Sequence, residues 1–107
     1  MLLENFGKGW GIFEIQLEHL QKVIPTLEFK DIARYSGMLR ITATAPTLEE
    51  QYVADCVLYT IERQSARKCE FCHKRGHRQG PDEYLKETIC VCSSCYALEV
   101  DKILTQQ

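Results

Sequence analysis

Two Cys-x-x-Cys pairs constrain this sequence more than any other feature. Cys69 and Cys72 form the first pair, Cys92 and Cys95 form the second, and nineteen residues lie between them. Each such turn directs two thiolates toward one point, and zinc prefers four soft or borderline ligands in a tetrahedron. The separation of the pairs is typical of zinc sites. The sequence therefore predicts one structural Zn²⁺ bound by these four cysteines.

Three nearby residues are alternative ligands. Cys90 lies two positions before Cys92, but only Cys92 has the same two-residue gap to Cys95 that separates the first pair. We therefore favour Cys92 as the third ligand and keep Cys90 as its alternative. His73 and His77 follow the first pair and could each replace a cysteine, although four thiols already suffice.

The length and the start of the chain favour a small intracellular domain. A chain of 107 residues buries only a modest core, so a structural metal adds substantial folding energy. The first residues show no basic segment followed by a long apolar run, so no secretory signal is expected. No apolar run is long enough to span a membrane. We therefore expect a cytoplasmic protein with reduced, metal-bound thiols rather than disulfides.

The first 45 residues predict a helix and then a hairpin. Pro25 ends the helix, which spans about residues 12–24. Trp10 precedes it and is expected to anchor it to the core. Residues 39–44 alternate apolar and polar side chains, and a Ser36-Gly37 turn separates them from residues 27–35, which predicts two paired strands within residues 27–45. The apolar residues with helical period in the first segment are Phe13, Leu17, Leu20 and Ile24.

A second helix is predicted from Thr47 to about Ala66. Thr47 and Glu50 have the spacing of a capping box. We expect Cys56 to lie in the core, as buried cysteines usually do. The face expected to be apolar comprises Leu48, Tyr52, Cys56, Tyr59 and Arg63, widened by Val53, Val57 and Ile61.

After the first cysteine pair, residues 84–91 are predicted to return as a strand, and residues 96–104 to form a short closing helix. Leu98, Ile103 and Leu104 of this helix are expected to face inward. The fold class is thus α+β. A helix-hairpin-helix lobe (residues 1–66) precedes a zinc-ribbon module (residues 67–107), and both are expected to form one compact unit.

The net charge of −2 conceals an asymmetry. Residues 1–62 hold nine acidic and five basic side chains, whereas residues 63–107 hold six acidic and eight basic ones. Phe71 or Tyr84 could stack on bases beside the basic residues. The candidate nucleic-acid contacts are Arg63, Arg67, Lys68, Lys74, Arg75 and Arg78.

Several motifs, in this order, resemble small uncharacterised zinc-ribbon proteins of phages and prophage regions. The matching residues are Gly9-Trp10, the run from Tyr35 to Arg40, Ser65, Cys69-Glu70-x-Cys72, Gly76, Arg78, Thr88 and the last cysteine pair. The chain departs from the family pattern at its end, where two extra residues separate Thr88 from the favoured pair. The resemblance implies a phage-type setting and an accessory, non-catalytic role.

Two functional hypotheses follow. The first is a non-catalytic protein-interaction module for an unidentified partner, such as a bacterial host complex, with a counter-defence (anti-CRISPR-like) inhibitor as its specific form. The alternative is nucleic-acid binding through the basic residues beside the first cysteine pair. No enzyme is expected, because four protein ligands leave zinc no open position for water or substrate.

Overall fold

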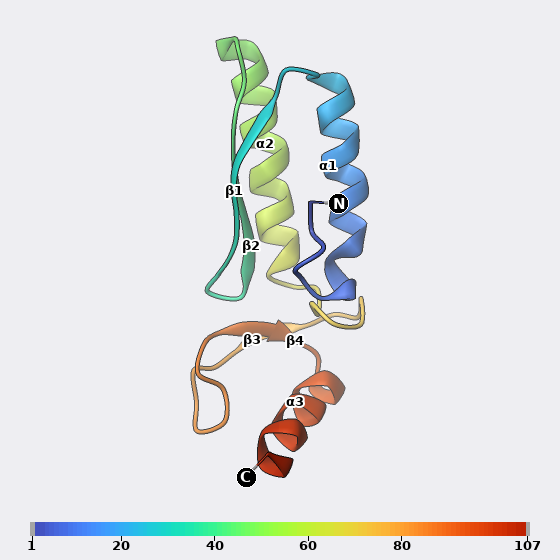
Figure 1. The fold of residues 1–107 in the computed structure, drawn as a ribbon, viewed down its shortest axis with the longest axis vertical. Coiled ribbons are helices and arrows are strands. Elements are labelled where there is room, and N and C mark those ends of the chain that lie inside the picture. Colours follow the sequence, from blue (N-terminus) through green and yellow to red (C-terminus); the bar gives the residue numbers. More distant parts are fainter. Residues whose placement is uncertain (1, 107) are drawn as a thin grey trace.

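The computed structural model describes residues 2–106 and has an elongated shape, with principal extents of 51 × 21 × 20 Å. One end holds two helices and a long hairpin, and the other holds a short hairpin and the last helix (Figure 1). The elements are η1 (Lys8–Trp10), α1 (Gly11–Val23), β1 (Glu28–Tyr35), β2 (Met38–Thr44), α2 (Leu48–Ser65), β3 (His77–Gln79), β4 (Ile89–Val91) and α3 (Ser93–Thr105). The α+β class is confirmed, with two separate two-stranded antiparallel sheets.

The first helix and hairpin form where the sequence predicts them. Ile24 has a non-helical backbone before Pro25 and ends α1. In the hairpin turn, Ser36 and Gly37 both have positive φ, at 49° and 79°. Two-residue turns of this kind match the twist of the strands they join. They set the register, in which Tyr35 pairs with Met38, and a bulge follows Phe29.

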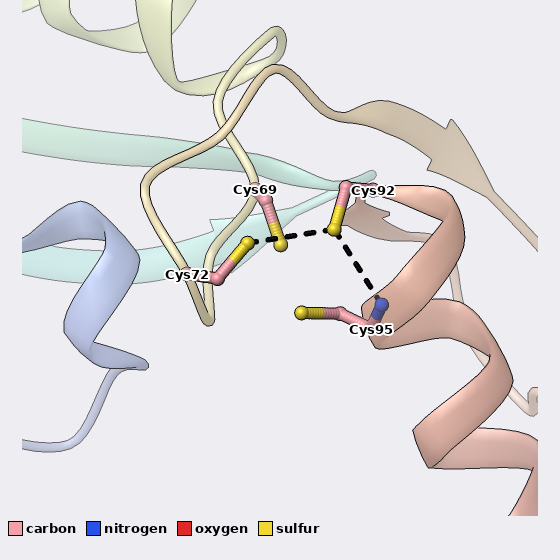
Figure 2. Close-up of side chains that lie close together, drawn as sticks. All are labelled: Cys69, Cys72, Cys92 and Cys95. Carbon is pink, nitrogen blue, oxygen red and sulfur yellow. Dashed lines mark hydrogen bonds between the residues drawn. The ribbon is translucent and has the colours of Figure 1, made fainter.

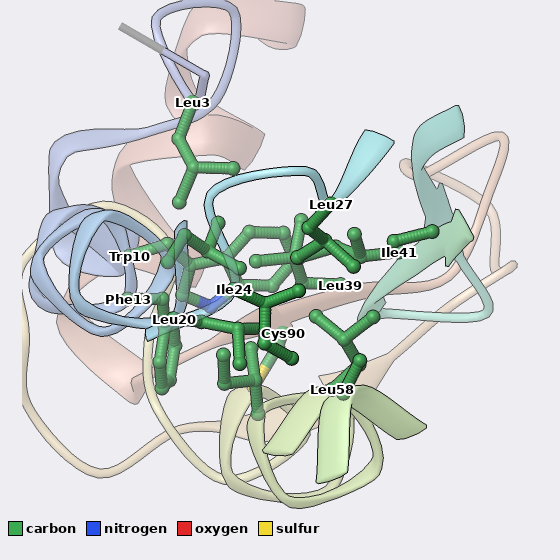
Figure 3. Close-up of a cluster of buried hydrophobic side chains, with 14 residues drawn as sticks. Leu3, Trp10, Phe13, Leu20, Ile24, Leu27, Leu39, Ile41, Leu58 and Cys90 are labelled. Atoms are coloured by element: carbon green, nitrogen blue, oxygen red, sulfur yellow. The ribbon is translucent and has the colours of Figure 1, made fainter. Parts of the chain in front are cut away.

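The main core lies between α1, α2 and the long hairpin (Figure 3). Trp10 is fully buried there, as predicted, and the apolar stripe of α1 from Phe13 to Ile24 is buried with it. Ser65 is also fully buried, and its hydroxyl accepts the Leu39 N–H at 2.8 Å while donating to the Glu62 carbonyl at 2.6 Å. This serine fixes the end of α2 against the start of β2.

The inward face of α2 differs from the prediction. Leu48 is 90% exposed and Tyr52 is 72% exposed, and Cys56 is also exposed instead of buried. The buried positions are Ala54, Leu58, Ile61 and Ser65. Apolar residues occur on two faces of this helix, so periodicity alone did not fix which face is inward. Packing against β2 and α1 selects the face that carries the small Ala54.

The start of α2 has the Thr47 half of the predicted capping box, but the Glu50 carboxylate accepts from the Thr47 hydroxyl instead of the Thr47 N–H. The Thr47 hydroxyl oxygen accepts the Glu50 N–H at 3.1 Å, and the same hydroxyl donates to the Glu50 carboxylate at 2.9 Å. Such caps satisfy backbone donors that have no partner within the helix.

The C-terminal part is less regular than predicted. The returning strand covers only Ile89–Val91, because the Asp82 carboxylate accepts the N–H groups of Tyr84 and Leu85 and holds that segment in a turn. The closing helix begins earlier, at Ser93.

Its inward face also differs from the prediction. Leu98 and Leu104 are exposed, and of the three predicted residues only Ile103 packs on the second hydrophobic cluster. That cluster is small and half of its six buried residues are cysteines, so it offers little apolar surface for α3 to cover.

The structure shows how the two lobes are arranged. The domain boundary at residue 66 and the packing of both lobes as one compact unit stay predictions. Within residues 2–106, no helix has both the length and the hydrophobicity needed to cross a bilayer.

The two faces of α2 can be compared by truncation. Leu58→Ala is expected to lower the free energy of unfolding by about 2–5 kcal/mol, because it removes buried methyl groups. Tyr59→Ala, next to it but 58% exposed, is expected to change it by about 0.5 kcal/mol or less. Urea unfolding measures both. Equal losses would show that the inward face of α2 is assigned wrongly.

Candidate metal centre

The first cysteine pair lies in a tight turn after α2. The Cys69 N–H donates to the Lys74 carbonyl at 2.7 Å, and the Gly76 N–H donates to the Arg67 carbonyl at 2.8 Å. Gly76 passes so close to the turn that a Cβ there would lie 2.8 Å from the Cys69 nitrogen. Only glycine fits without displacing the backbone that holds Cys69.

The second pair lies where β4 meets α3. Cys92 is the N-cap of α3, and its sulfur accepts the Cys95 N–H at 3.5 Å. The helix thereby fixes both thiols, because the cap and the first turn are hydrogen-bonded to each other.

The four thiols converge (Figure 2). The Sγ atoms of Cys69, Cys72, Cys92 and Cys95 all lie within 4.8 Å of one another, and those of Cys72 and Cys92 are 3.4 Å apart. A tetrahedron with Zn–S bonds of about 2.3 Å has edges of about 3.8 Å, so the cluster has the size of a four-thiolate site. All six cysteines of the chain are free thiols. The cluster can therefore bind a single metal ion.

The surroundings of the cluster favour a thiolate at Cys92. The Cys95 backbone N–H, together with the Cys72 side chain, lowers the pKa of the Cys92 thiol to about 6. Thiols at helix N-termini are commonly acidified in this way, and the thiolate is the form that binds metal. Burial, in contrast, raises the pKa of Cys95.

The alternative ligands lie elsewhere. Cys90 is fully buried in the main core beside α2, and its thiol donates to the Ala66 carbonyl at 3.3 Å (Figure 3). Burial raises its pKa to about 11, which keeps it protonated at neutral pH. His73 and His77 are exposed and outside the thiol cluster. His73 instead occupies a turn position with φ of 70°.

Sequence reasoning missed Glu70, which lies inside the first cysteine pair and is 1% exposed. Its carboxylate pairs with Arg34 of β1, with the Arg34 Nε donating at 2.8 Å, and it also accepts the Gly7 N–H at 3.0 Å. A glutamate between two cysteines usually faces solvent, so only the tertiary structure shows this contact. The sequence signal for Glu70 was its position in the Cys69-Glu70-x-Cys72 motif, one of the motifs that resemble the phage-type proteins.

The predicted basic residues lie near the first pair. Arg63 lies in the last turn of α2 and Arg67 follows just after that helix, whereas Lys68 and Arg75 are opposite each other in an antiparallel bridge. Five of the six are exposed and Lys68 is half-buried. Among the ion pairs formed within residues 2–106, none involves any of the six.

The proposed stacking aromatics are not part of this basic surface. Phe71 and Tyr84 line a separate groove beside α3, together with Arg34. Tyr59 instead lines a shallow hollow with Arg63 and Arg67, and the Arg63 guanidinium lies 5.7 Å from its ring centre.

No family model matches this sequence, and no curated protein or solved structure is significantly similar to it. The phage-type resemblance of its motifs thus stays a prediction.

Metal analysis distinguishes Cys92 from Cys90. The protein is expected to hold about one metal ion per chain. Cys92→Ser should lose it, because it removes one of four ligands. Cys90→Ala should keep it, yet lower the free energy of unfolding by about 1–2 kcal/mol through lost core packing. Elemental analysis of the purified, folded variants measures the content. Metal loss in Cys90→Ala with retention in Cys92→Ser would reverse the assignment.

Proposed function

We propose that this protein is a non-catalytic zinc-ribbon module that binds another protein through the exposed face of α2.

Zinc is the metal that this site favours. Four thiolates in a tetrahedral arrangement suit zinc or iron. Zinc is preferred because a closed four-thiolate site is typical of structural zinc in small modules, where metal binding supplies folding energy. Four protein ligands also leave no coordination position for substrate, which supports a structural role. Elemental analysis that finds zinc, in a colourless protein, supports this identity. Iron with visible absorbance would contradict it.

The observation that carries the interaction proposal is an apolar stripe exposed on α2. The stripe consists of Leu48, Tyr52, Cys56 and Tyr59, all of them exposed. Their helical spacing aligns them along one face. Single exposed apolar residues are ordinary, but a continuous row with two tyrosines is typical of a binding surface. The stripe contributes nothing to the main core, which uses the opposite face of the helix.

The charge around this stripe favours a basic partner. Residues 48–62 of α2 contain Glu49, Glu50, Asp55 and Glu62 and no lysine or arginine. Of these four carboxylates, only Glu62 pairs with a basic side chain among residues 2–106, that of Arg40. Complementary charge accelerates and orients protein association. The surface therefore suits a protein with a basic patch, such as one that handles nucleic acid. The phage-type resemblance narrows this to a host defence complex that the protein would inhibit.

The stripe can be tested with paired alanine variants. Wild-type protein immobilised on beads should capture basic proteins from a bacterial lysate, identified by mass spectrometry. Tyr52→Ala is expected to weaken binding of the captured protein about tenfold or more, as truncation of an interface anchor commonly does. Leu98→Ala, an exposed apolar residue of α3, is the matched control and should bind normally. Equal capture by both variants would contradict the α2 surface.

A second candidate function, nucleic-acid binding, is favoured by one observation. Within residues 2–106, the six predicted basic residues form no ion pair with a carboxylate, and Tyr59 of α2 lines a hollow together with Arg63 and Arg67. Arginine rows beside an exposed ring are suited to phosphates and stacked bases.

Salt dependence tests this second function. Binding to short single-stranded DNA or RNA should weaken steeply with salt, and Arg67→Gln should reduce the slope of log affinity against log salt by about one. Lys102→Gln is the control, because Lys102 lies on α3 and pairs with Glu99 at 3.1 Å. No binding at low salt would remove this candidate.

A further inference from the structure

The first cysteine pair is held by the N-terminal lobe as well as by its own turn. Glu70 has four separate hydrogen-bonding connections. Its N–H donates to the Cys90 carbonyl at 3.0 Å, and its carbonyl accepts the Gly9 N–H at 2.6 Å. Its carboxylate accepts from Arg34 and from Gly7. Two of these partners precede α1, and a third is on the long hairpin.

Lys68, the residue before the first cysteine pair, is also hydrogen-bonded to the N-terminal lobe. The indole N–H of Trp10 donates to the Lys68 carbonyl at 3.0 Å. Segment 7–10 therefore contacts the backbone on both sides of Cys69. The approach is so close that a Cβ on Gly9 would lie 2.0 Å from the Cys69 carbonyl oxygen, and one on Gly7 would lie 2.4 Å from the Glu70 carbonyl oxygen.

Because Glu70 is charged and buried, its carboxylate requires hydrogen-bonding partners within this contact. A buried carboxylate is strongly unfavourable unless it is paired and hydrogen-bonded. Arg34 is the only basic side chain paired with it among residues 2–106, and it binds through two nitrogens. Without Arg34, Glu70 would have to move toward water. Cys69 adjoins it directly and Cys72 is two residues away, so such a movement displaces two of the four thiols.

We propose that Arg34 and segment 7–10 are positioning residues of the metal centre, so that metal binding and docking of the N-terminal lobe are coupled. This inference rests on the proposed zinc site. Groups that orient metal ligands commonly change metal affinity by 10- to 100-fold. Coupling is reciprocal, so zinc must also stabilise the contact between segment 7–10 and the first cysteine pair.

Zinc affinity of matched variants tests one direction. A competition titration against a chromophoric chelator is expected to give on the order of 10- to 100-fold weaker binding for Arg34→Gln and for Gly9→Ala. Arg40→Gln, on the same hairpin but in an exposed ion pair with Glu62, should bind zinc like the wild type. Gly11→Ala should do the same, because a Cβ there meets nothing within 4 Å.

The zinc affinities of these variants distinguish a positioning role of Arg34 from a role in the stability of the fold alone. If Arg34 only stabilised the fold, Arg34→Gln would lower the melting temperature equally with and without zinc and leave the affinity unchanged. Folded Arg34→Gln and Gly9→Ala proteins with the affinity of the controls would overturn the inference. A wild-type protein that binds no zinc would overturn the proposed function, and the inference with it.

The wild-type protein tests the other direction and does not depend on a variant that folds. Removing zinc with a chelator is expected to speed hydrogen exchange at the Gly7 and Gly9 amides and to shift the emission of Trp10, the single tryptophan, to longer wavelength. The Ile24 amide, bonded to the Leu20 carbonyl at the far end of α1, is the internal control. Unchanged exchange at Gly9 and unchanged emission would overturn the coupling.

Discussion

The buried carboxylate of Glu70 connects the N-terminal lobe of this protein to the first cysteine turn. Glu70 is charged and almost fully enclosed, so it must be satisfied by the groups around it, and those groups come from β1 and from the segment before α1. The long hairpin thereby meets the cysteine turn across 36 residues of sequence. Buried ion pairs add little net stability, but losing one partner is costly. Loss of Arg34 would therefore leave Glu70 as an uncompensated buried charge between the lobes.

The C-terminal part has a much smaller apolar core than the N-terminal part, and it contains the four clustered cysteines that can bind a metal ion. The main cluster contains Trp10, Phe13 and several leucines and isoleucines, whereas the second cluster contains three of the four metal-site cysteines and only Leu85, Ile89 and Val91 beside them. A hydrophobic core this small needs a further cross-link, such as a bound metal ion, to hold β3, β4 and α3 together. Cys90 is the exception, because it lies on β4 but belongs to the main core. It adds a second connection between the lobes.

The protein presents two exposed surfaces of different chemistry, one along α2 and one around the first cysteine turn. The exposed stripe of α2 is apolar and lies on a segment whose charged residues are all acidic up to Glu62. The end of the same helix and the first cysteine turn carry basic side chains that form no ion pair within residues 2–106. The boundary between them lies near Arg63 on one continuous helix. A partner with charges of both signs, such as a protein bound to nucleic acid, would complement both surfaces at once.

Features that depend on neighbouring residues were predictable, and features that depend on distant surfaces were not. The cysteine spacing, the Thr47 cap, the Ser36-Gly37 turn and the α1 stripe are local patterns, so the sequence was sufficient to predict them. The inward face of α2 was predicted wrongly because that helix carries apolar residues on two sides, and the choice is made by β2 and α1. The sequence favoured Cys92 over Cys90 by spacing alone, and the fold gives the reason by placing Cys90 in the main core. The burial of Glu70 could not be predicted from the residues around it, because the partners of its carboxylate lie 36 and 63 residues away.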